Sequence, residues 1–252
     1  MLFFKRILGV SDTVASTERR GDSRYVVGDS FPLKAVLNTI GRDEIGQPLQ
    51  SKDGQGWDWT GHLVNLSVAG ARMQVPPTMH SHQGDACRLK LEIEGYELIV
   101  PGTIAHISER RDSFIYGLQL TPRDGEVDPP YRQLLELIAL GAALKPDKAA
   151  APDKYGHLHE RYVGEEFSQL DVWRDLAGQH VIGFDLRLNS CRVRGLVGQV
   201  GLEYLLNAED GTPHPASPEQ HAEIKRLFHW VVPNIATAVP ADVREFLGKY
   251  AT

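Results

Sequence analysis

The stretch from residue 32 to residue 120 limits most strongly what this chain can fold into. It contains short runs in which apolar and polar residues alternate, at residues 33–40, 57–66, 70–75, 86–93, 97–108 and 114–120. The segments between the runs are polar or rich in Gly and Pro, and one of them is the tight Glu94-Gly95 pair. Alternation with a period of two is typical of half-buried strands, and such turns connect antiparallel strands. The sequence therefore predicts a mainly β N-terminal domain, either an antiparallel barrel or a sandwich.

After Pro129 and Pro130 the apolar residues follow a helical period instead. One stripe of an amphipathic helix is formed by Tyr131, Leu134, Leu135, Ile138 and Ala142. Residues 145–154 (KPDKAAAPDK) follow, and their prolines, small residues and charges are typical of an interdomain linker. We therefore expect one domain over residues 1–144 and a second over residues 155–252.

A smaller α+β domain is expected for residues 155–252. A helix is predicted over residues 165–177, followed by a strand over residues 182–188. The apolar face of this predicted helix consists of Phe167, Leu170, Trp173 and Leu176. Ser217-Pro218 with Gln220 predicts the start of another helix with a capping box, and Pro240 the start of a last one. The apolar spacing within residues 191–206 suits a helix, but three glycines weaken one, so this segment receives no assignment.

Composition and charge exclude several classes of protein. Hydrophobic residues make up 42% and charged residues 24% of the chain, as in ordinary soluble proteins. The net charge of −6 argues against non-specific binding of a nucleic-acid polymer. Residues 1–26 nevertheless carry five Lys or Arg against three acids, a net of +2, whereas residues 146–252 carry eleven against fifteen, a net of −4. The positive charge at the start of the chain suits a small anion.

Cysteine usage and hydropathy bear on location. Cys87 and Cys191 lie far apart and form no CxxC motif, so neither a disulfide framework nor a thiolate zinc site is indicated. A cytoplasmic protein is therefore expected. The apolar opening of residues 1–10 is interrupted by Lys5 and Arg6, so we interpret it as a docked terminal segment and expect no transmembrane segment.

Two short motifs carry the candidate chemistry. Arg19, Arg20 and Arg24 lie in the polar sequence RRGDSRY before the first strand. Guanidinium groups bind phosphate oxygens, form paired hydrogen bonds with guanine and stack on bases. The second motif is Asn65-Leu66-Ser67-Val68-Ala69-Gly70, at the junction of two predicted strands. An amide, a hydroxyl and a glycine at one corner can hold a nucleotide closely.

Together these motifs resemble the signature of the PilZ family, RxxxR followed tens of residues later by D/NxSxxG. Arg20 to Arg24 match the first motif and Asn65 to Gly70 the second at every signature position. The segments GHLVNLSVAGARMQV, GTIAHI and FIYGLQL also resemble strands of that family. The resemblance covers residues 15–144 and does not extend past the expected linker.

The resemblance implies a six-stranded antiparallel β-barrel with a C-terminal helix, acting as a bacterial receptor for cyclic di-GMP that signals to a partner protein. It implies that Arg20 and Arg24 contact guanine and phosphate, and that Asn65, Ser67 and Gly70 form the opposing wall. Arg19 directly before the motif implies two intercalated ligand molecules, whose four negative charges suit a third arginine. Stacked ligands can also join two copies of the chain into a homodimer. No cofactor beyond this ligand is expected.

Plainer explanations remain for each residue. Arg19 can be a solvated charge beside Glu18, Asn65 can cap a turn, Ser67 can bond its own backbone and Gly70 can serve the bend alone. We place Arg72 at the rim of the site or in a structural role. The alternative function is a barrel that contacts proteins without binding a nucleotide.

Metal binding and catalysis are not predicted. His80 with His82, and His157 with His159 and Glu160, are spaced as metal ligands can be, but a complete set is not identifiable in either segment. Solvated loop histidines are the simpler interpretation. The sequence contains no nucleophile elbow, Walker loop or dinucleotide fingerprint, so we expect a protein that is not an enzyme.

Overall fold

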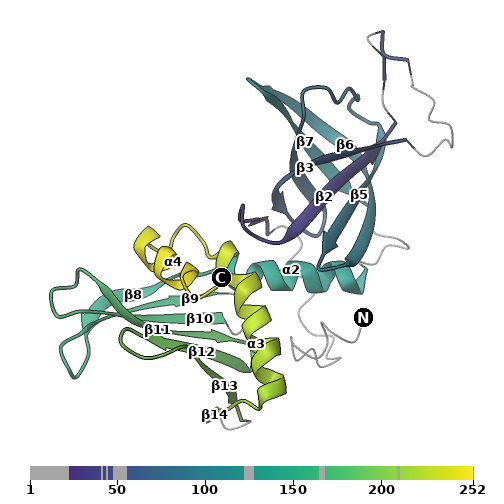
Figure 1. Cartoon of the computed structure of the whole chain (residues 1–252). Helices are drawn as coiled ribbons and strands as arrows, with labels where there is room; N and C mark the ends of the chain where they lie inside the picture. The colour runs from purple at the N-terminus through teal and green to yellow at the C-terminus, as the bar shows by residue number, and fades with distance from the viewer. Residues whose placement is uncertain are drawn as a thin grey trace. The chain divides into compact units, whose positions relative to one another are not determined.

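The computed structural model describes residues 23–40, 42–43, 45–47, 56–121, 128–164, 168–208 and 211–251. The described chain divides between Leu135 and Glu136 into two compact units, each dominated by one β-sheet (Figure 1). The division falls inside helix α2, Pro129–Ala142. The segment of residues 1–10, which we expect to dock on the protein, lies outside the described residues.

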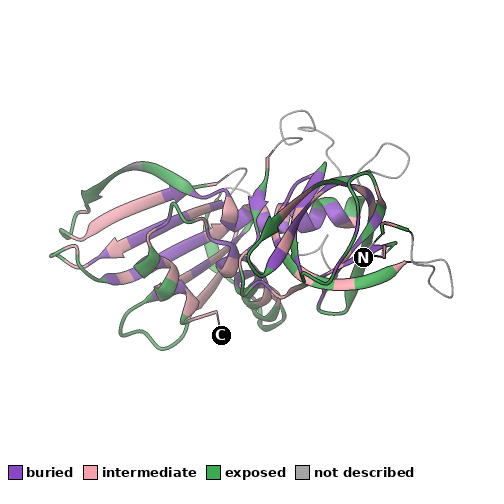
Figure 2. Ribbon diagram, turned by 90° about the horizontal axis from the view of Figure 1, so that it is seen from above, coloured by how far each residue is buried: buried purple, intermediate pink, exposed green. Residues whose placement is uncertain are grey.

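The first unit is a closed β-barrel. Its strands are β1 (Tyr25–Val26), β2 (Leu33–Thr39), β3 (Trp57–Leu66), β4 (Gly70–Val75), β5 (Ala86–Ile93), β6 (Tyr96–Arg110) and β7 (Ser113–Leu120). Six of them pair antiparallel in the order β3-β2-β5-β6-β7-β4, and β4 pairs with β3 to close the ring, which Figure 2 shows end-on. The six strands and the antiparallel barrel predicted from the sequence are confirmed.

Alternation along the strands builds the barrel core. In β5, Cys87, Leu89, Leu91 and Ile93 are buried inside, while the residues between them face outward. The hairpin to β6 turns at Glu94 and Gly95, with φ of 46° and 84°. Two successive residues with positive φ match the twist of a two-residue hairpin, which explains the Glu-Gly pair. Closure leaves the six barrel strands without a free edge.

Helix α2 follows the barrel. Four residues of the predicted stripe, Tyr131, Leu134, Leu135 and Ile138, are buried, and the fifth, Ala142, is half-buried. The linker predicted next is wrong. Residues 145–152 form strand β8 (Lys145–Pro152), which pairs with β9 (Leu158–Val163). An edge strand needs a partner on one side only, so it tolerates prolines, small residues and charges, and its two register shifts accompany this composition.

The second unit is a sheet of seven antiparallel strands with helices on one face. After β8 and β9 come β10 (Ser168–Arg174), β11 (Val181–Leu188), β12 (Cys191–Leu196), β13 (Glu203–Asn207) and β14 (Pro213–Pro215), each beside its neighbour in sequence. The helices are α3 (Pro218–Val231), a 3-10 turn at Val232–Asn234 and α4 (Ala241–Gly248). Phe184 of β11 packs against Phe228 of α3 and Phe246 of α4. The predicted α+β character is therefore present.

The helix predicted over residues 165–177 is wrong, because β10 occupies residues 168–174. Leu170 faces the core, Trp173 lies on the opposite face of the sheet, and Leu176 is exposed in the following turn. Their helical spacing is therefore a coincidence. Residues 191–206, left unassigned from the sequence, form the hairpin of β12 and β13, with Gly198 and Gly201 at positive φ in its turn.

Both predicted helix starts in the second unit are confirmed. Ser217 Oγ accepts a hydrogen bond from the Gln220 backbone, and the Gln220 side chain accepts one from the Ser217 backbone N–H at 2.8 Å. This is a complete capping box, with Pro218 at the first helical position. Pro240 is the N-cap of α4, and Val243 and Leu247 bury its apolar face.

Candidate functional site

Four of the six predicted site residues lie in the described part of the chain. Asn65 is the penultimate residue of β3, Ser67 lies in the β3–β4 turn and Gly70 begins β4. Arg24 directly precedes β1. Arg19 and Arg20 lie outside the described residues.

Strand β1 places Arg24 at the corner formed by the second motif. Tyr25 pairs with Leu66, and Val26 with Asn65, in antiparallel register. Tyr25 points inward, with 9% of its surface exposed. The Arg24 guanidinium reaches the start of β4, where its Nη2 atom lies 3.6 Å from the position that a Cβ at Gly70 would take. The two motifs, which are more than forty residues apart in sequence, therefore meet.

Hydrogen bonds hold the corner in one conformation. The Ser67 backbone N–H donates to the Gly70 carbonyl at 2.8 Å, and Ser67 Oγ donates to the same oxygen at 3.1 Å. The Ser67 carbonyl accepts from the hydroxyl of Tyr131 at 2.7 Å. Burial raises the pKa of Tyr131 far above its usual range, so the hydroxyl stays protonated as a donor. Both residues are almost fully buried, which makes this a rigid corner.

Gly70 has a steric role. A Cβ there would lie 2.8 Å from the carbonyl oxygen of Leu118 in β7 and 3.9 Å from Ser67 Oγ. Because the nearest atom belongs to the backbone of a paired strand, it cannot move aside easily. The glycine therefore permits the close approach of β4 to β7, and it leaves the space beside the Arg24 guanidinium open.

Asn65 offers an unused acceptor. Its Oδ1 atom is buried but accepts no hydrogen bond from the described part of the chain. A buried polar atom without a partner is costly and uncommon, and such an atom often faces a ligand or water. Asn65 therefore differs from an ordinary turn cap.

Arg72 lies closer to this corner than the sequence interpretation placed it. It is the direct cross-strand partner of Asn65, so the two side chains share the outer face of the barrel. Its guanidinium forms no ion pair with the described residues. On β7, the strand on the other side of β4, Arg72 pairs with Gly117. Because Gly117 has no side chain, it leaves space beside Arg72 on the outer face of the barrel. The signal was available in the sequence, since pairing across a short turn places the residue two after Gly70 opposite Asn65.

The histidine pairs do not assemble a metal centre among the described residues. No group of three or more His, Cys, Asp or Glu side chains is arranged there to hold a metal ion. His159 binds Asp171 through Nε2 at 2.7 Å and stacks on Trp173, while Glu160 accepts hydrogen bonds from Tyr162 and Arg174. His159 and Glu160 therefore lie in polar networks of the second sheet, whereas His157 lies beside Asp153 in the turn before β9.

The site combines a cationic guanidinium, an unused amide oxygen and an open glycine at a rigid turn. It is suited to a planar, polar ligand that carries negative charge. Within the described ranges, no helix is long and apolar enough to cross a lipid bilayer.

Comparison with known proteins agrees with the barrel and its corner. A family model described as "PilZ domain" matches residues 44–140, a range that contains Asn65, Ser67, Gly70 and Tyr131 but not the arginine motif. No curated protein matches the chain. The family model ends within α2, so it does not cover the second sheet. Residues 44–140, which hold most of the barrel and the first part of α2, are thus identified as a PilZ domain.

Proposed function

We propose that this protein is a receptor that binds cyclic di-GMP between the arginines of residues 19–24 and the corner of Asn65, Ser67 and Gly70. The observation that carries the proposal is the position of Arg24, whose guanidinium lies against Gly70. Asn65, at the end of the neighbouring strand, has an amide oxygen without a partner in the described chain. The family supports the identity of the ligand.

The chemistry of each group fits one part of the ligand. Guanine has N–H donors on its Watson–Crick edge, which the Oδ1 atom of Asn65 can accept. The phosphodiesters are anions, which Arg20 and Arg24 neutralise and bind through charge-assisted hydrogen bonds. Gly70 lets a base or phosphate approach the backbone closely. Burying the guanine edge against Asn65 also satisfies an acceptor that the protein leaves unpaired.

Arg72 extends the proposed site. Because it faces outward beside Asn65, its guanidinium can contact the same ligand from the strand next to the corner. Arg24 and Arg72 together provide two positive charges in the described part of the chain, which match the two negative charges of the ligand. Arg19 adds a third cation in the preceding segment, which suits two intercalated ligand molecules. Stacked ligands of this kind can also bridge two copies of the chain.

Helix α2 gives a route from ligand to output. Its Tyr131 hydroxyl binds the backbone of Ser67 in the ligand corner, and the helix continues past Leu135 into the second unit. Ligand binding that draws the arginines against this corner would bias the helix, and thereby what the second domain presents to a partner protein.

Calorimetric titration with cyclic di-GMP tests the proposal. We expect Arg20→Ala, Arg24→Ala and Asn65→Ala each to weaken binding by at least about tenfold, since each removes a charge-assisted or buried hydrogen bond. Arg110→Ala, at an exposed arginine near the end of β6, is the matched control and should bind as the wild type does. Equal affinity in all four variants would instead support the alternative, a barrel used only for protein contacts.

A further inference from the structure

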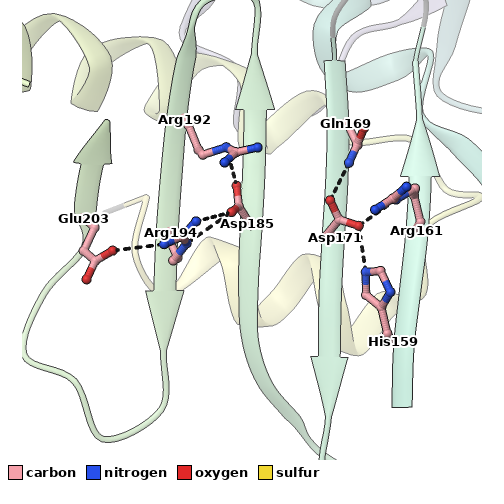
Figure 3. Close-up of polar contacts among 8 residues, drawn as sticks. All are labelled: His159, Arg161, Gln169, Asp171, Asp185, Arg192, Arg194 and Glu203. Atoms are coloured by element: carbon pink, nitrogen blue, oxygen red, sulfur yellow. Dashed lines mark hydrogen bonds and ion pairs between the residues drawn. The ribbon is translucent and has the colours of Figure 1, made fainter. Parts of the chain in front are cut away.

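The second sheet has one face that its own helices do not cover. Phe184, Leu186 and Leu188 of β11 point toward the core under α3 and α4. The residues between them point the other way, and Figure 3 shows this opposite face, with the helices behind the strands. Within the described residues of the second unit, no helix lies over it. An antiparallel sheet can leave one face in water, but that face is then normally polar throughout.

Strand register arranges the uncovered face in three parallel rows. The apolar row contains His159, Trp173, Gly183 and Leu196. The carboxylate row contains Arg161, Asp171, Asp185, Arg194 and Glu203. The arginine row contains Arg187 and Arg192 at its centre, with Gln169 and Val163 on one side and Leu205 on the other. Neighbouring rows are two residues apart along each strand, so the three rows differ in chemistry across a single flat surface.

The carboxylate row is neutralised internally (Figure 3). Asp171 accepts hydrogen bonds from Arg161 Nε at 2.8 Å and His159 Nε2 at 2.7 Å. Asp185 accepts from Arg194 Nη2 at 2.9 Å. Both aspartates are buried, with 8% and 7% of their surface exposed. The row therefore has little charge to offer a partner, and it forms a rigid middle between the other two rows.

The arginine row has unsatisfied charge. Arg187 and Arg192 lie directly opposite each other on β11 and β12, and like charges in that position repel. Arg192 Nε lies 3.2 Å from an Asp185 oxygen, which is an ion-pair distance without hydrogen-bond alignment. The Nε atom of Arg187 is buried, and its guanidinium has no hydrogen bond or ion pair within the described chain. An anion between the two guanidinium groups would remove both defects.

The apolar row contains a hollow. A pocket of about 330 Å³ is lined by Trp173, Ile182, Leu196, His157 and Arg194. Gly183 lies between Trp173 and Leu196 in the sheet and has no side chain to fill the gap. Leu196 in this lining is 42% exposed, and Val197, the next residue in the chain, is 61% exposed. Exposed apolar side chains gathered around a hollow are typical of protein contact sites.

The distance between the hollow and the arginines sets the spacing of the side chains that a bound peptide would need. Trp173 and Gln169, Gly183 and Arg187, and Leu196 and Arg192 are each four residues apart on one strand, about 13 Å at the usual rise of a strand. An extended peptide directs residues i and i+4 to the same side with the same spacing. A segment that runs along the strands can therefore reach both features.

We propose that this face docks an extended segment of a partner protein that has an aromatic or aliphatic residue four positions from an acidic one. The apolar residue enters the hollow beside Trp173, and the carboxylate lies between Arg187 and Arg192. The fixed spacing between one hollow and one pair of guanidinium groups favours a protein segment over a lipid surface, because a peptide holds two side chains at a set distance whereas lipid headgroups do not. The inference does not depend on the nucleotide site.

Nuclear magnetic resonance of the full-length protein tests this docking site through the indole N–H signal of Trp173, assigned with Trp173→Phe. The probes are two ten-residue peptides of Gly and Ser with acetylated N-termini and amidated C-termini. Each contains one Phe and one Glu, with the Glu four positions after the Phe in one peptide and four positions before it in the other. We expect one of the two orders to shift the Trp173 signal at concentrations below ~1 mM, since a short anchor with one ion pair binds weakly. Replacing Glu by Lys, or Phe by Ser, should weaken the response by about tenfold.

Charge reversal provides the sharper comparison. Arg187→Glu should invert the preference, so that the Phe/Lys peptide now binds more tightly than the Phe/Glu peptide. Arg187→Gln serves if the first variant does not fold, and it should abolish the preference between the two peptides. Arg111→Glu, an exposed residue of the first domain, is the control for net charge and should behave as the wild type does.

Three results would overturn the proposal. The Trp173 signal could remain fixed with every peptide up to ~1 mM. The order of peptide affinities could be the same in Arg187→Glu as in the wild type. The signal could also respond to phosphatidylglycerol vesicles, or to dilution of the protein alone, and not to the peptides, which would assign the face to a lipid surface or to a second copy of the chain.

Discussion

The hydroxyl of Tyr131 in α2 donates a 2.7 Å hydrogen bond to the backbone carbonyl of Ser67, 64 residues earlier in the chain. Both residues are buried, so the carbonyl has no access to water when this donor is removed. The bond connects the helix that follows the barrel to the turn at the centre of the candidate ligand site.

Tyr131→Phe should therefore affect both stability and binding. We expect the free energy of unfolding to fall by about 1–2 kcal/mol, the usual cost of leaving a buried carbonyl without a donor. Urea denaturation of the full chain measures this loss. The affinity for cyclic di-GMP should fall as well, because the Ser67 turn loses one of its supports. Unchanged stability and affinity would show that the hydrogen bond does not hold the corner.

Gly70→Ala tests the close approach of β4 to β7. The new methyl group would lie 2.8 Å from the Leu118 carbonyl, and the two strands would have to separate to relieve the contact. We expect a loss of roughly 1–3 kcal/mol in unfolding free energy, which is typical of overpacking, together with weaker nucleotide binding. Gly95→Ala is not a suitable control because of its positive φ, but Gly248→Ala, with nothing near its Cβ position, should be tolerated. Wild-type stability of Gly70→Ala would contradict the steric role.

The second domain should lose stability in acid through Asp242. A hydrogen bond from Arg174 holds the pKa of this carboxyl below its usual value, and Arg174 is itself buried and bound to Glu160. A pKa that is lower in the folded state stabilises the fold above the unfolded value of about 3.9, and this contribution is lost as the pH falls through the folded pKa. Asp242→Asn should therefore flatten the fall in melting temperature below about pH 5. An identical pH profile in the variant would rule out this source of acid sensitivity.

Arg19 should set the stoichiometry of the ligand. If two intercalated molecules bind, neutralising their charge requires the additional arginine, and Arg19→Leu should reduce the fitted stoichiometry from two ligands per chain to one. Sedimentation of the complex would show at the same time whether the ligand joins two copies of the chain. A wild-type stoichiometry of one would rule out the intercalated pair.

The two domains differed in how far the sequence could predict them. In the barrel strands, as in β5, every second residue faces the core inside the ring. The sequence therefore alternates between apolar and polar residues, and the barrel strands were predicted nearly to the residue. In β10 the apolar residues did not all face the core: Trp173 lies on the uncovered face of the sheet and Leu176 in the following turn. Their spacing with Leu170 therefore imitated the period of a helix. In β8 the composition resembled a linker, since an edge strand requires little burial.

The candidate site was predicted in its residues but not in its geometry. The motifs identified Arg24, Asn65, Ser67 and Gly70, yet the contact between Arg24 and Gly70 depends on β1, a pairing of only two residues. Arg72 was placed at the rim because its pairing with Asn65 follows only when the register across the β3–β4 turn is worked out residue by residue. The hydrogen bond from Tyr131 joins segments too distant in sequence for any local pattern to reveal.

Side-chain resonances of the proposed site offer the most direct test that cyclic di-GMP binds there. In isotope-labelled protein, the Asn65 amide, the Arg24 guanidinium Nε–H and the Gly70 backbone N–H should all shift on titration with the nucleotide and saturate together. The exposed Arg110 signal should stay in place. If cyclic di-GMP leaves the Asn65, Arg24 and Gly70 signals unmoved, or shifts only residues of the second sheet, the assignment of this corner as the ligand site is wrong.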